Sequence, residues 1–254
     1  MRCLDLELII FLLSTGFVAA FFDSVVGGGG LISTPALMMT GLPINIVLGT
    51  NKMASIMCSS TSTLTFFRSG KINLAAIKYP FILAILGSML GASSIKLIPV
   101  AYLKNIIIVM LALVAIYTFF RKDWGEISTY GATRKNSVIA LLFALVLGFY
   151  DGFFGPGTGS FLIFAFLLIG FDFVTAAGNA KALNFASNLG ALVTFIYMDS
   201  VNYAYGLVMG VAMIAGALVG ARFAINKGVT YVRPLFLMVT MAMIGKQLWD
   251  IAVK

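Results

Sequence analysis

Long apolar runs recur along the whole chain, and they constrain its fold more than any other feature. A helix needs about 20 apolar residues to cross the hydrocarbon core of a bilayer. Of the 254 residues, 61% are hydrophobic and 10% are charged, whereas globular chains average roughly 25% charged residues. The sequence therefore predicts an all-α polytopic membrane protein, a single transmembrane domain over residues 1–254 with roughly eight transmembrane helices.

The apolar runs fall into two length classes. The long runs are 8–26, 44–67, 74–95, 106–120, 137–154, 174–197, 203–224 and 233–252. The short runs are 31–39 and 161–169, and each of them follows a glycine-rich stretch. We therefore expect two interrupted helices among the full-length ones.

The positive charge is spread over the polar gaps of the chain, and the formal net charge is +8. Lys and Arg gather in the gaps 68–78, 121–135 and 222–233, as the positive-inside bias of membrane proteins requires. A basic patch with interleaved aromatic residues is absent from the sequence. The expected partners are accordingly the lipid bilayer and a small solute, with no nucleic acid.

The cysteine and histidine content limits the chemistry that is open to the chain. Cys3 and Cys58 give neither a disulfide framework nor the spacing of a metal site. The chain contains no His, which removes the commonest metal ligand and the commonest general base. We expect a protein that is not an enzyme, with no metal and no cofactor.

The two halves of the sequence match each other, which indicates a duplication. Asp23 matches Asp151, and the glycines after each acid match at the same spacing of 128 residues. After the glycines the spacing becomes 129 residues, and Lys52 of "GTNK" matches Lys181 of "GNAK". Farther on, "GSMLGA" matches "GALVGA". The sequence predicts repeat one at 1–122, a linker at 123–136 and repeat two at 137–254.

The loop charges indicate that the second repeat is inverted relative to the first. If the gaps 68–78 and 121–135 lie on one side, the equivalent of the first, 197–203, holds Asp199 and no Lys or Arg. Inverted repeats are typical of secondary transporters, whose site lies at the repeat interface near the midplane. Lys96 and Lys104 argue against inversion, because they would lie outside, and a parallel duplication stays as the alternative.

Two matched stretches, "FFDSVVGGGG" and "YDGFFGPGTGS", place an acid and several glycines inside apolar sequence. Consecutive glycines weaken a helix, and irregular backbone at membrane depth is tolerated only within protein or facing water. The sequence therefore predicts two broken, re-entrant helices around one central site. Close helix packing is the alternative, and it is favoured for the pairs Gly87/Gly91 and Gly216/Gly220.

Charged and small polar residues near these breaks form the candidate site. A charge near the bilayer centre usually faces a cavity or a partner, and half-helix N-termini favour anions. The candidate substrate-binding residues are Gly27, Gly28, Gly29, Gly30, Asn51, Lys52, Ser55, Gly155, Gly157, Thr158, Gly159, Asn179, Lys181, Asn184 and Asn188. Asp23 and Asp151 have either a proton-coupling or a structural role, and the sequence leaves open whether Asp23/Lys52 and Asp151/Lys181 form ion pairs.

The motifs "GFVAAFFDSVVGGGGLISTPALMMTGLP", "GTNK", "GFYDGFFGPGTGSF" and "GNAKALNFASNLG" resemble those of the TauE/SafE family of sulfite and organosulfonate exporters. The resemblance covers essentially the whole chain and implies a bacterial inner-membrane protein with two related halves that transports anions. Pro156 and Thr158 depart from a full glycine run, so the two halves of the site need not be equivalent.

These observations favour a secondary transporter for a small anion such as sulfite, thiosulfate or an organosulfonate. We expect a multi-pass protein of the bacterial inner membrane that works as an exporter and is coupled to protons. A membrane scaffold or assembly factor without flux is the alternative. The sequence does not decide which anion is carried, which ion is coupled, or whether the chain forms a homo-oligomer.

Overall fold

The structure is a computed structural model that describes residues 5–95 and 125–252, and all regular structure in these residues is helical. Seven helices have 20 or more residues: α1 (Leu6–Val26), α3 (Ile44–Arg68), α4 (Leu74–Ser93), α6 (Arg134–Phe153), α8 (Phe173–Tyr197), α9 (Tyr203–Lys227) and α10 (Val229–Ala252). The two short helices are α2 (Gly30–Met38) and α7 (Thr158–Leu168). The predicted run 106–120 and the end of repeat one lie outside the described residues.

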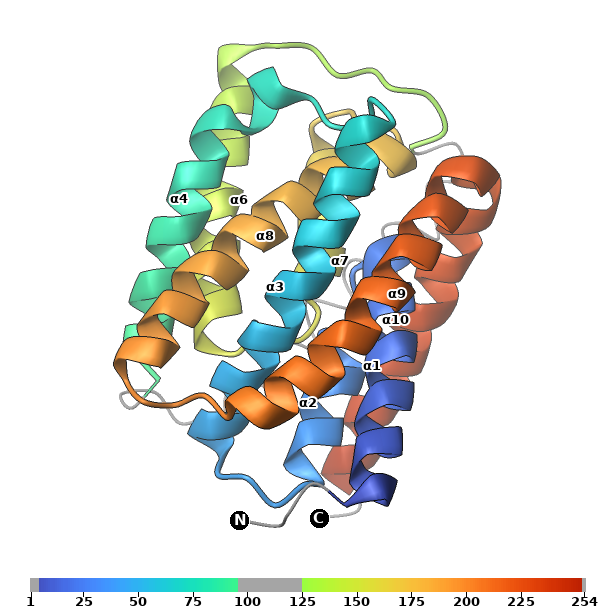
Figure 1. Cartoon of the computed structure of the whole chain (residues 1–254). Coiled ribbons are helices and arrows are strands. Elements are labelled where there is room, and N and C mark those ends of the chain that lie inside the picture. Colours follow the sequence, from blue (N-terminus) through green and yellow to red (C-terminus); the bar gives the residue numbers. More distant parts are fainter. Residues whose placement is uncertain (1–4, 96–124, 253–254) are drawn as a thin grey trace.

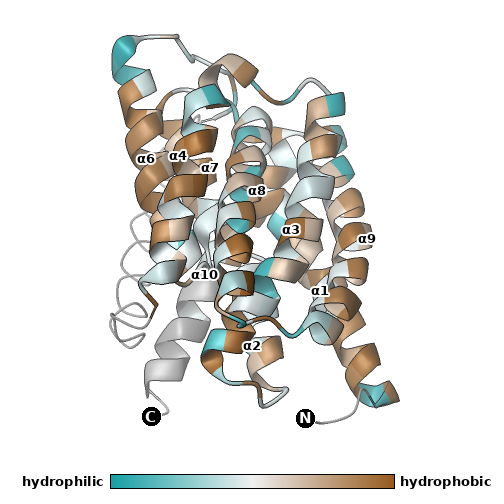
Figure 2. Ribbon diagram, turned by 60° about the vertical axis from the view of Figure 1, so that its left-hand side comes forward, coloured by the Kyte–Doolittle hydropathy of each residue, from teal (hydrophilic) through white to brown (hydrophobic). Residues whose placement is uncertain are grey.

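Four of the described helices, α1, α4, α6 and α9, are long and apolar enough to cross a membrane. The helices α3 and α8 have 25 residues each but carry more polar side chains, and almost every residue in the middle of α8 is buried. Figure 2 shows strongly hydrophobic residues on α1, α4, α6 and α9, and paler, more polar residues on α3 and α8. The polar helices therefore lie inside the bundle, where the apolar ones separate them from lipid.

The predicted inversion of the two repeats is confirmed by the course of the helices. In Figure 1, α1 and α3 run from the lower to the upper end, whereas their counterparts α6 and α8 run from the upper to the lower end. The packing follows the same relation, because α1 packs against α9 while α6 packs against α4, and α3 and α8 pack against each other. The bounds of the repeats stay a prediction.

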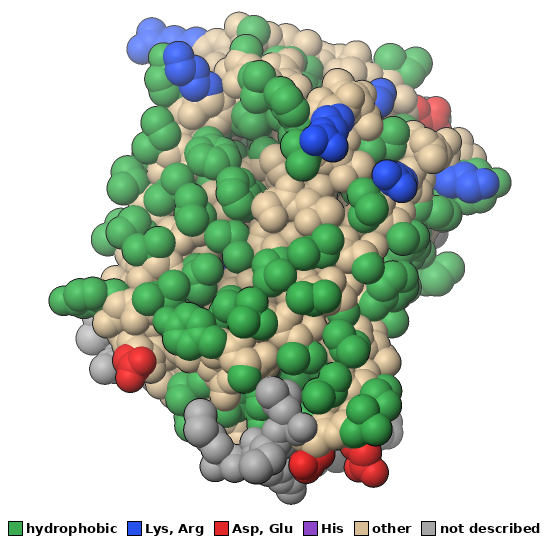
Figure 3. Space-filling view, viewed as in Figure 1, with side chains coloured by type: hydrophobic (Ala, Val, Ile, Leu, Met, Phe, Trp, Pro, Cys, Tyr) green, Lys and Arg blue, Asp and Glu red, His purple; other side chains and the backbone are tan. Residues whose placement is uncertain are grey.

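The charged residues separate to the two ends of the bundle. Figure 3 shows a broad hydrophobic face, with Lys and Arg toward its upper end and Asp and Glu mainly at its lower end. Arg68, Lys78 and Arg134 lie where α3 ends and where α4 and α6 begin, and these helix ends lie at the upper end in Figure 1. The segment 197–203 lies at the lower end, as the inversion requires. Lys96 and Lys104 lie outside the described residues.

Matched glycines bring helix backbones into contact at the two outer pairs of helices. A Cβ on Gly87 or Gly91 of α4 would overlap backbone atoms of Leu145 or Phe149 on α6. On the other side, a Cβ on Gly216 of α9 would overlap the backbone of Phe17 on α1. The packing role predicted for these small-residue pairs is confirmed, and it is the same in both repeats.

The first prediction concerns this helix packing. Gly216→Ala should lower the free energy of unfolding by about 1–3 kcal/mol or more, because the rigid backbone of α1 leaves no room for the methyl group. Thermal unfolding in detergent micelles measures the effect. Gly245→Ala on α10 is the matched control, since a Cβ there meets nothing within 4 Å. Equal unfolding temperatures for the two variants would contradict the packing role.

Candidate functional site

The break between α1 and α2 lies at Gly27, where the chain adopts a left-handed backbone. Gly27 has φ +80° and its N–H donates to the carbonyl of Asp23 at 2.9 Å, which ends α1. Side chains other than glycine rarely adopt this φ. Three residues later, α2 begins at Gly30. The helix break predicted from "GGGG" is therefore present, and it leaves the first amides of α2 facing the interior.

The second break, between α6 and α7, uses the same residue type at the matched positions. Gly155 and Gly157 have φ values of +96° and +85°, and α7 begins at Thr158. Pro156, which departs from the glycine run, accepts a hydrogen bond on its carbonyl from the Tyr150 hydroxyl. Both repeats therefore break their helix after the acid, but only the second secures its break with a phenol.

The two breaks touch each other backbone to backbone. Ser160 at the start of α7 donates its N–H to the Gly27 carbonyl at 3.2 Å and its hydroxyl to the Val26 carbonyl at 2.7 Å. These two bonds satisfy carbonyls that the break removes from the hydrogen-bond ladder of the helix. A Cβ on Gly27 or Gly159 would overlap the backbone of the other break. The glycines therefore permit a crossing that no larger residue allows.

Two ion pairs cross between the repeats at this point. Lys52 on α3 lies 2.8 Å from Asp151 Oδ1 on α6, and Lys181 on α8 lies 2.6 Å from Asp23 Oδ2 on α1. Each acid thus pairs with the lysine of the other repeat. The pairing within one repeat that the sequence left open, Asp23 with Lys52 and Asp151 with Lys181, is not the one that forms, because the inversion places each lysine beside the opposite break.

The lysines of both pairs are removed from solvent. The Lys52 side chain is 3% exposed and the Lys181 side chain is 0% exposed. The acids differ, since the Asp23 side chain is 17% exposed and that of Asp151 is 3% exposed. Burying a charge is tolerated only when it is paired and hydrogen-bonded, so these contacts hold the two repeats together.

Matched donors support the two acids. The Ser187 hydroxyl donates to Asp151 Oδ2 at 2.6 Å, and the Cys58 thiol lies 3.5 Å from Asp23 Oδ2. Cys58 and Ser187 occupy equivalent positions at the spacing of 129 residues. The sequence analysis placed neither of them in the site. The signal that was available is this equivalence, because it puts a hydrogen-bond donor beside the acid of each repeat.

A small cavity of about 20 Å³ lies between the breaks and the ion pairs. Its lining consists of Asp23, Gly27, Gly30, Asn51, Lys52, Ser55, Asp151, Gly155, Gly157, Gly159, Asn184 and Asn188. All of these belong to the set predicted from the sequence, and the structure brings them together. The cavity has room for about one water molecule, so the site is closed in this conformation. The role of these residues in binding stays a prediction.

Five other predicted residues lie outside the lining. The Gly29 N–H donates to Asp23 Oδ1 at 3.1 Å, and Lys181 pairs with the same carboxylate. Gly28 belongs to the break without lining the cavity, and the Thr158 hydroxyl donates to the Gly155 carbonyl. Asn179 lies apart, because its side-chain oxygen accepts from the N–H of Asn73, the N-cap residue of α4. Its binding role is untested, and its observed contact is with the start of a helix.

The position equivalent to Asn179 makes the same contact in repeat one. The Thr50 hydroxyl accepts from the N–H of Asn202, which caps α9, at 2.9 Å. Asn73 and Asn202 each accept a further hydrogen bond from the first turn of the helix that they cap. This symmetry explains why a polar residue precedes each motif lysine by two positions without lining the cavity.

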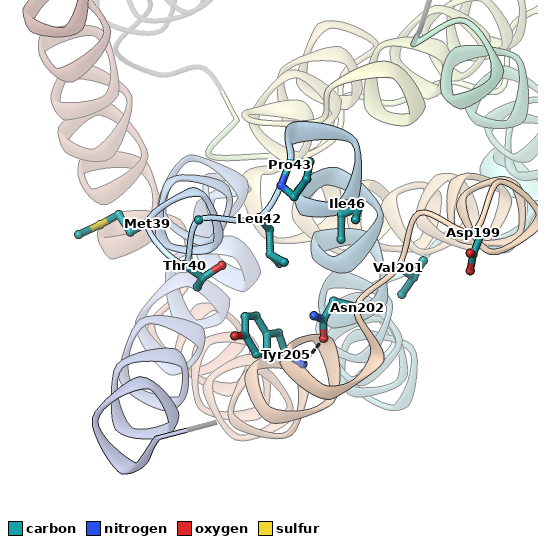
Figure 4. Close-up of a pocket in the computed structure, with 10 residues that line it drawn as sticks. Met39, Thr40, Leu42, Pro43, Ile46, Asp199, Val201, Asn202 and Tyr205 are labelled. Atoms are coloured by element: carbon teal, nitrogen blue, oxygen red, sulfur yellow. Dashed lines mark hydrogen bonds between the residues drawn. The ribbon is translucent and has the colours of Figure 1, made fainter. Parts of the chain in front are cut away.

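A larger pocket of about 620 Å³ opens at the acidic end of the bundle. Figure 4 shows its residues on the turn between α2 and α3 and on the turn between α8 and α9, with Asp199, Asn202 and Tyr205 on one side and Met39, Thr40 and Pro43 on the other. Ile46 of α3 also lines it. Lys52 is less than two helical turns farther along α3, so this pocket leads toward the central cavity.

The second prediction tests the crossed pairing. Lys52→Gln should lower the free energy of unfolding by about 3–5 kcal/mol, because it leaves Asp151 buried without its counterion. Adding Asp151→Asn should restore most of the loss, since both charges are then gone. Denaturant unfolding in detergent micelles measures the three proteins.

The matched control is Lys52→Gln combined with Asp23→Asn. This double variant removes one charge from each pair and leaves Lys181 and Asp151 unpaired, so it should be less stable than either single variant. If Asp23→Asn rescued Lys52→Gln as well as Asp151→Asn does, the pairing across the repeats would be wrong.

Comparisons with known proteins agree on one family. The family model "Sulfite exporter TauE/SafE" matches residues 12–246. A relative from Haemophilus influenzae, named "Probable membrane transporter protein", is 38% identical over 252 residues, which cover 97% of each chain. The Escherichia coli K12 protein "Probable membrane transporter protein YfcA" is 36% identical over 92% of this chain and 87% of its own length.

More distant similarity extends to Bacillus subtilis. The protein named "Probable membrane transporter protein YunE" is 26% identical over 94% of this chain and 96% of its own length. No solved structure matches the chain. The family model and the relatives cover both breaks and both ion pairs, as well as the apolar helices around them. The chain therefore belongs to the TauE/SafE family, and it is a membrane transporter of that family.

Proposed function

We propose that the protein is a secondary transporter that exports a small sulfur-containing anion, such as sulfite, thiosulfate or an organosulfonate, together with protons. The observation that carries this proposal is the convergence of two lysines and two half-helix N-termini on one central cavity. Both features favour an anion, the first by charge and the second by dipole and free amides. The family name supports the sulfur-containing class.

The amides at the start of the half-helices supply hydrogen-bond donors for an oxyanion. Within the described residues, the N–H groups of Gly30 and Gly159 have no hydrogen-bond partner, and both glycines line the cavity. Asn51, Asn184 and Asn188 add side-chain amides to the same lining. An oxyanion with three acceptor oxygens suits such a set of donors, because each oxygen accepts more than one hydrogen bond.

The closed cavity requires a conformational change during transport. With space for about one water molecule, the site holds a substrate only after the two repeats move or the carboxylates turn away. In transporters with inverted repeats, one repeat or bundle moves against the other around a fixed site. The structure thus supports an occluded state in such a cycle.

The charge at the two ends supports the orientation and the direction of transport. The basic end of the bundle faces the cytoplasm by the positive-inside bias, which suits a multi-pass protein of the bacterial inner membrane. The pocket at the opposite end is lined by Asp199 and by no Lys or Arg. An anion that reaches this pocket is repelled rather than held, which favours its release to the outside.

The third prediction is flux. The purified protein in liposomes should carry sulfite or thiosulfate across the bilayer, measured by the loss of the anion from loaded vesicles. Lys181→Gln should slow the initial rate by about tenfold or more, because a hydrogen bond to a charged group contributes about 1.5–3 kcal/mol. Lys135→Gln at the exposed start of α6 is the matched control, and it should keep the wild-type rate.

The alternative, a scaffold without flux, gives a different result. Folded wild-type protein that moves none of a panel of sulfur oxyanions, under a pH gradient of either direction, would contradict the proposed function and favour the scaffold.

A further inference from the structure

The carboxylate of Asp23 occupies the position that a substrate anion needs. Its Oδ2 atom accepts from the Lys181 ammonium at 2.6 Å, and its Oδ1 atom accepts from the Gly29 N–H at 3.1 Å. Gly29 is the N-cap residue of α2. The donors that hold this carboxylate are therefore a buried cation and a half-helix N-terminus, the two features that bind anions.

Asp151 does not have this arrangement. Its oxygens accept from Lys52 and from the Ser187 hydroxyl, and no described amide of the α7 N-terminus donates to it. It is also 3% exposed, whereas Asp23 is 17% exposed. A proton consequently reaches Asp23 more easily, and its arrival there frees a half-helix amide as well as a lysine.

The lysines differ in what remains after their acid is neutralised. Lys52 also donates to Asn188 Oδ1 at 3.2 Å, so it keeps a partner. Asp23 is the one partner that the described part of the chain gives to Lys181. If Asp23 is protonated, Lys181 is left as a buried cation with no counterion, which is costly unless an anion takes the vacated place.

The other charged and titratable groups around Asp23 leave this balance intact. Lys181 reaches it from α8 and Cys58 from α3, while Lys52 and Asp151 line the far side of the same cavity as a pair. The helices α2, α7, α9 and α10 contribute no titratable side chain to the described lining. The four paired groups sum to zero charge, and one proton on Asp23 makes the sum +1.

We propose that Asp23 is the proton-coupling residue, and that its carboxylate is exchanged for the substrate: a proton binds Asp23, the neutral side chain releases Lys181 and the Gly29 N–H, and one monovalent anion takes its place. The proton stays on Asp23 while the anion is bound and leaves to water when the anion does. One proton and one anion then cross together with no net charge. This assignment rests on the proposed anion transport.

The fourth prediction measures this exchange with methanesulfonate, a sulfonate whose charge does not change over the neutral and mildly acidic range. Its affinity for the wild-type protein in detergent, measured by titration calorimetry, should rise about tenfold for each unit that the pH falls, the slope of one linked proton. Asp23→Asn mimics the protonated acid and should bind with no such slope. Asp151→Asn, the matched variant in the other repeat, should keep the slope.

A second measurement serves if Asp23→Asn does not fold. Calorimetry in buffers of different ionisation enthalpy gives the protons taken up per anion, which should be about one for the wild type and for Asp151→Asn. Binding without proton uptake by the wild type, or loss of uptake in Asp151→Asn, would overturn the assignment while leaving anion transport in place. No binding of methanesulfonate, sulfite or thiosulfate at any pH would instead contradict the proposed function.

Discussion

The buried charges of Lys52, Lys181, Asp23 and Asp151 impose the constraint on which the rest of the structure depends. An apolar bundle tolerates four charges only if each has a partner within hydrogen-bond reach. The chain meets this condition by pairing each acid with the lysine of the opposite repeat. The pairs therefore join the repeats at the point where a transporter has to let them move, and a substrate that replaces one carboxylate weakens that connection.

The glycine-rich breaks make this pairing possible. An acid on an uninterrupted helix would be separated from the other repeat by the width of two helices with their side chains. Ending α1 at Val26 and starting α7 at Thr158 lets the two breaks touch, with Gly27 against Gly159. The hydrogen bonds from Ser160 to Val26 and Gly27 compensate for the interrupted helices. Backbone contact and charge pairing thus depend on each other.

Much of this arrangement could be predicted from the sequence, because it leaves a periodic or repeated signal. The duplication predicted the inverted halves, and the glycine runs predicted both breaks and the residues that line the cavity. The partner of each lysine could not be predicted, since Lys52 is near Asp23 in sequence and near Asp151 only after the repeats interlock. Asn179 resembled the asparagines of the site, but its helix face meets the start of α4. Cys58 was missed because its role follows from its equivalence to Ser187.

The departures from symmetry are as informative as the symmetry itself. Gly41 and Gly170 are equivalent turns, and both have positive φ. A Cβ on Gly41 would meet nothing within 4 Å, whereas one on Gly170 would meet the Thr129 hydroxyl and backbone. The segment that begins at Gly125 lies against the second turn, with Tyr130 stacked on Phe171 at 4.0 Å between ring centroids.

This contact covers the turn at the basic end, and the equivalent turn at the acidic end lines the open pocket of Figure 4. Two perfectly matched repeats would make the inward-open and outward-open states equal in free energy. An interaction that is present at only one end stabilises the state in which that end is closed, and it shifts the populations accordingly. The segment between the repeats therefore contributes to the direction in which the closed site opens, although it lies far from the charges that bind.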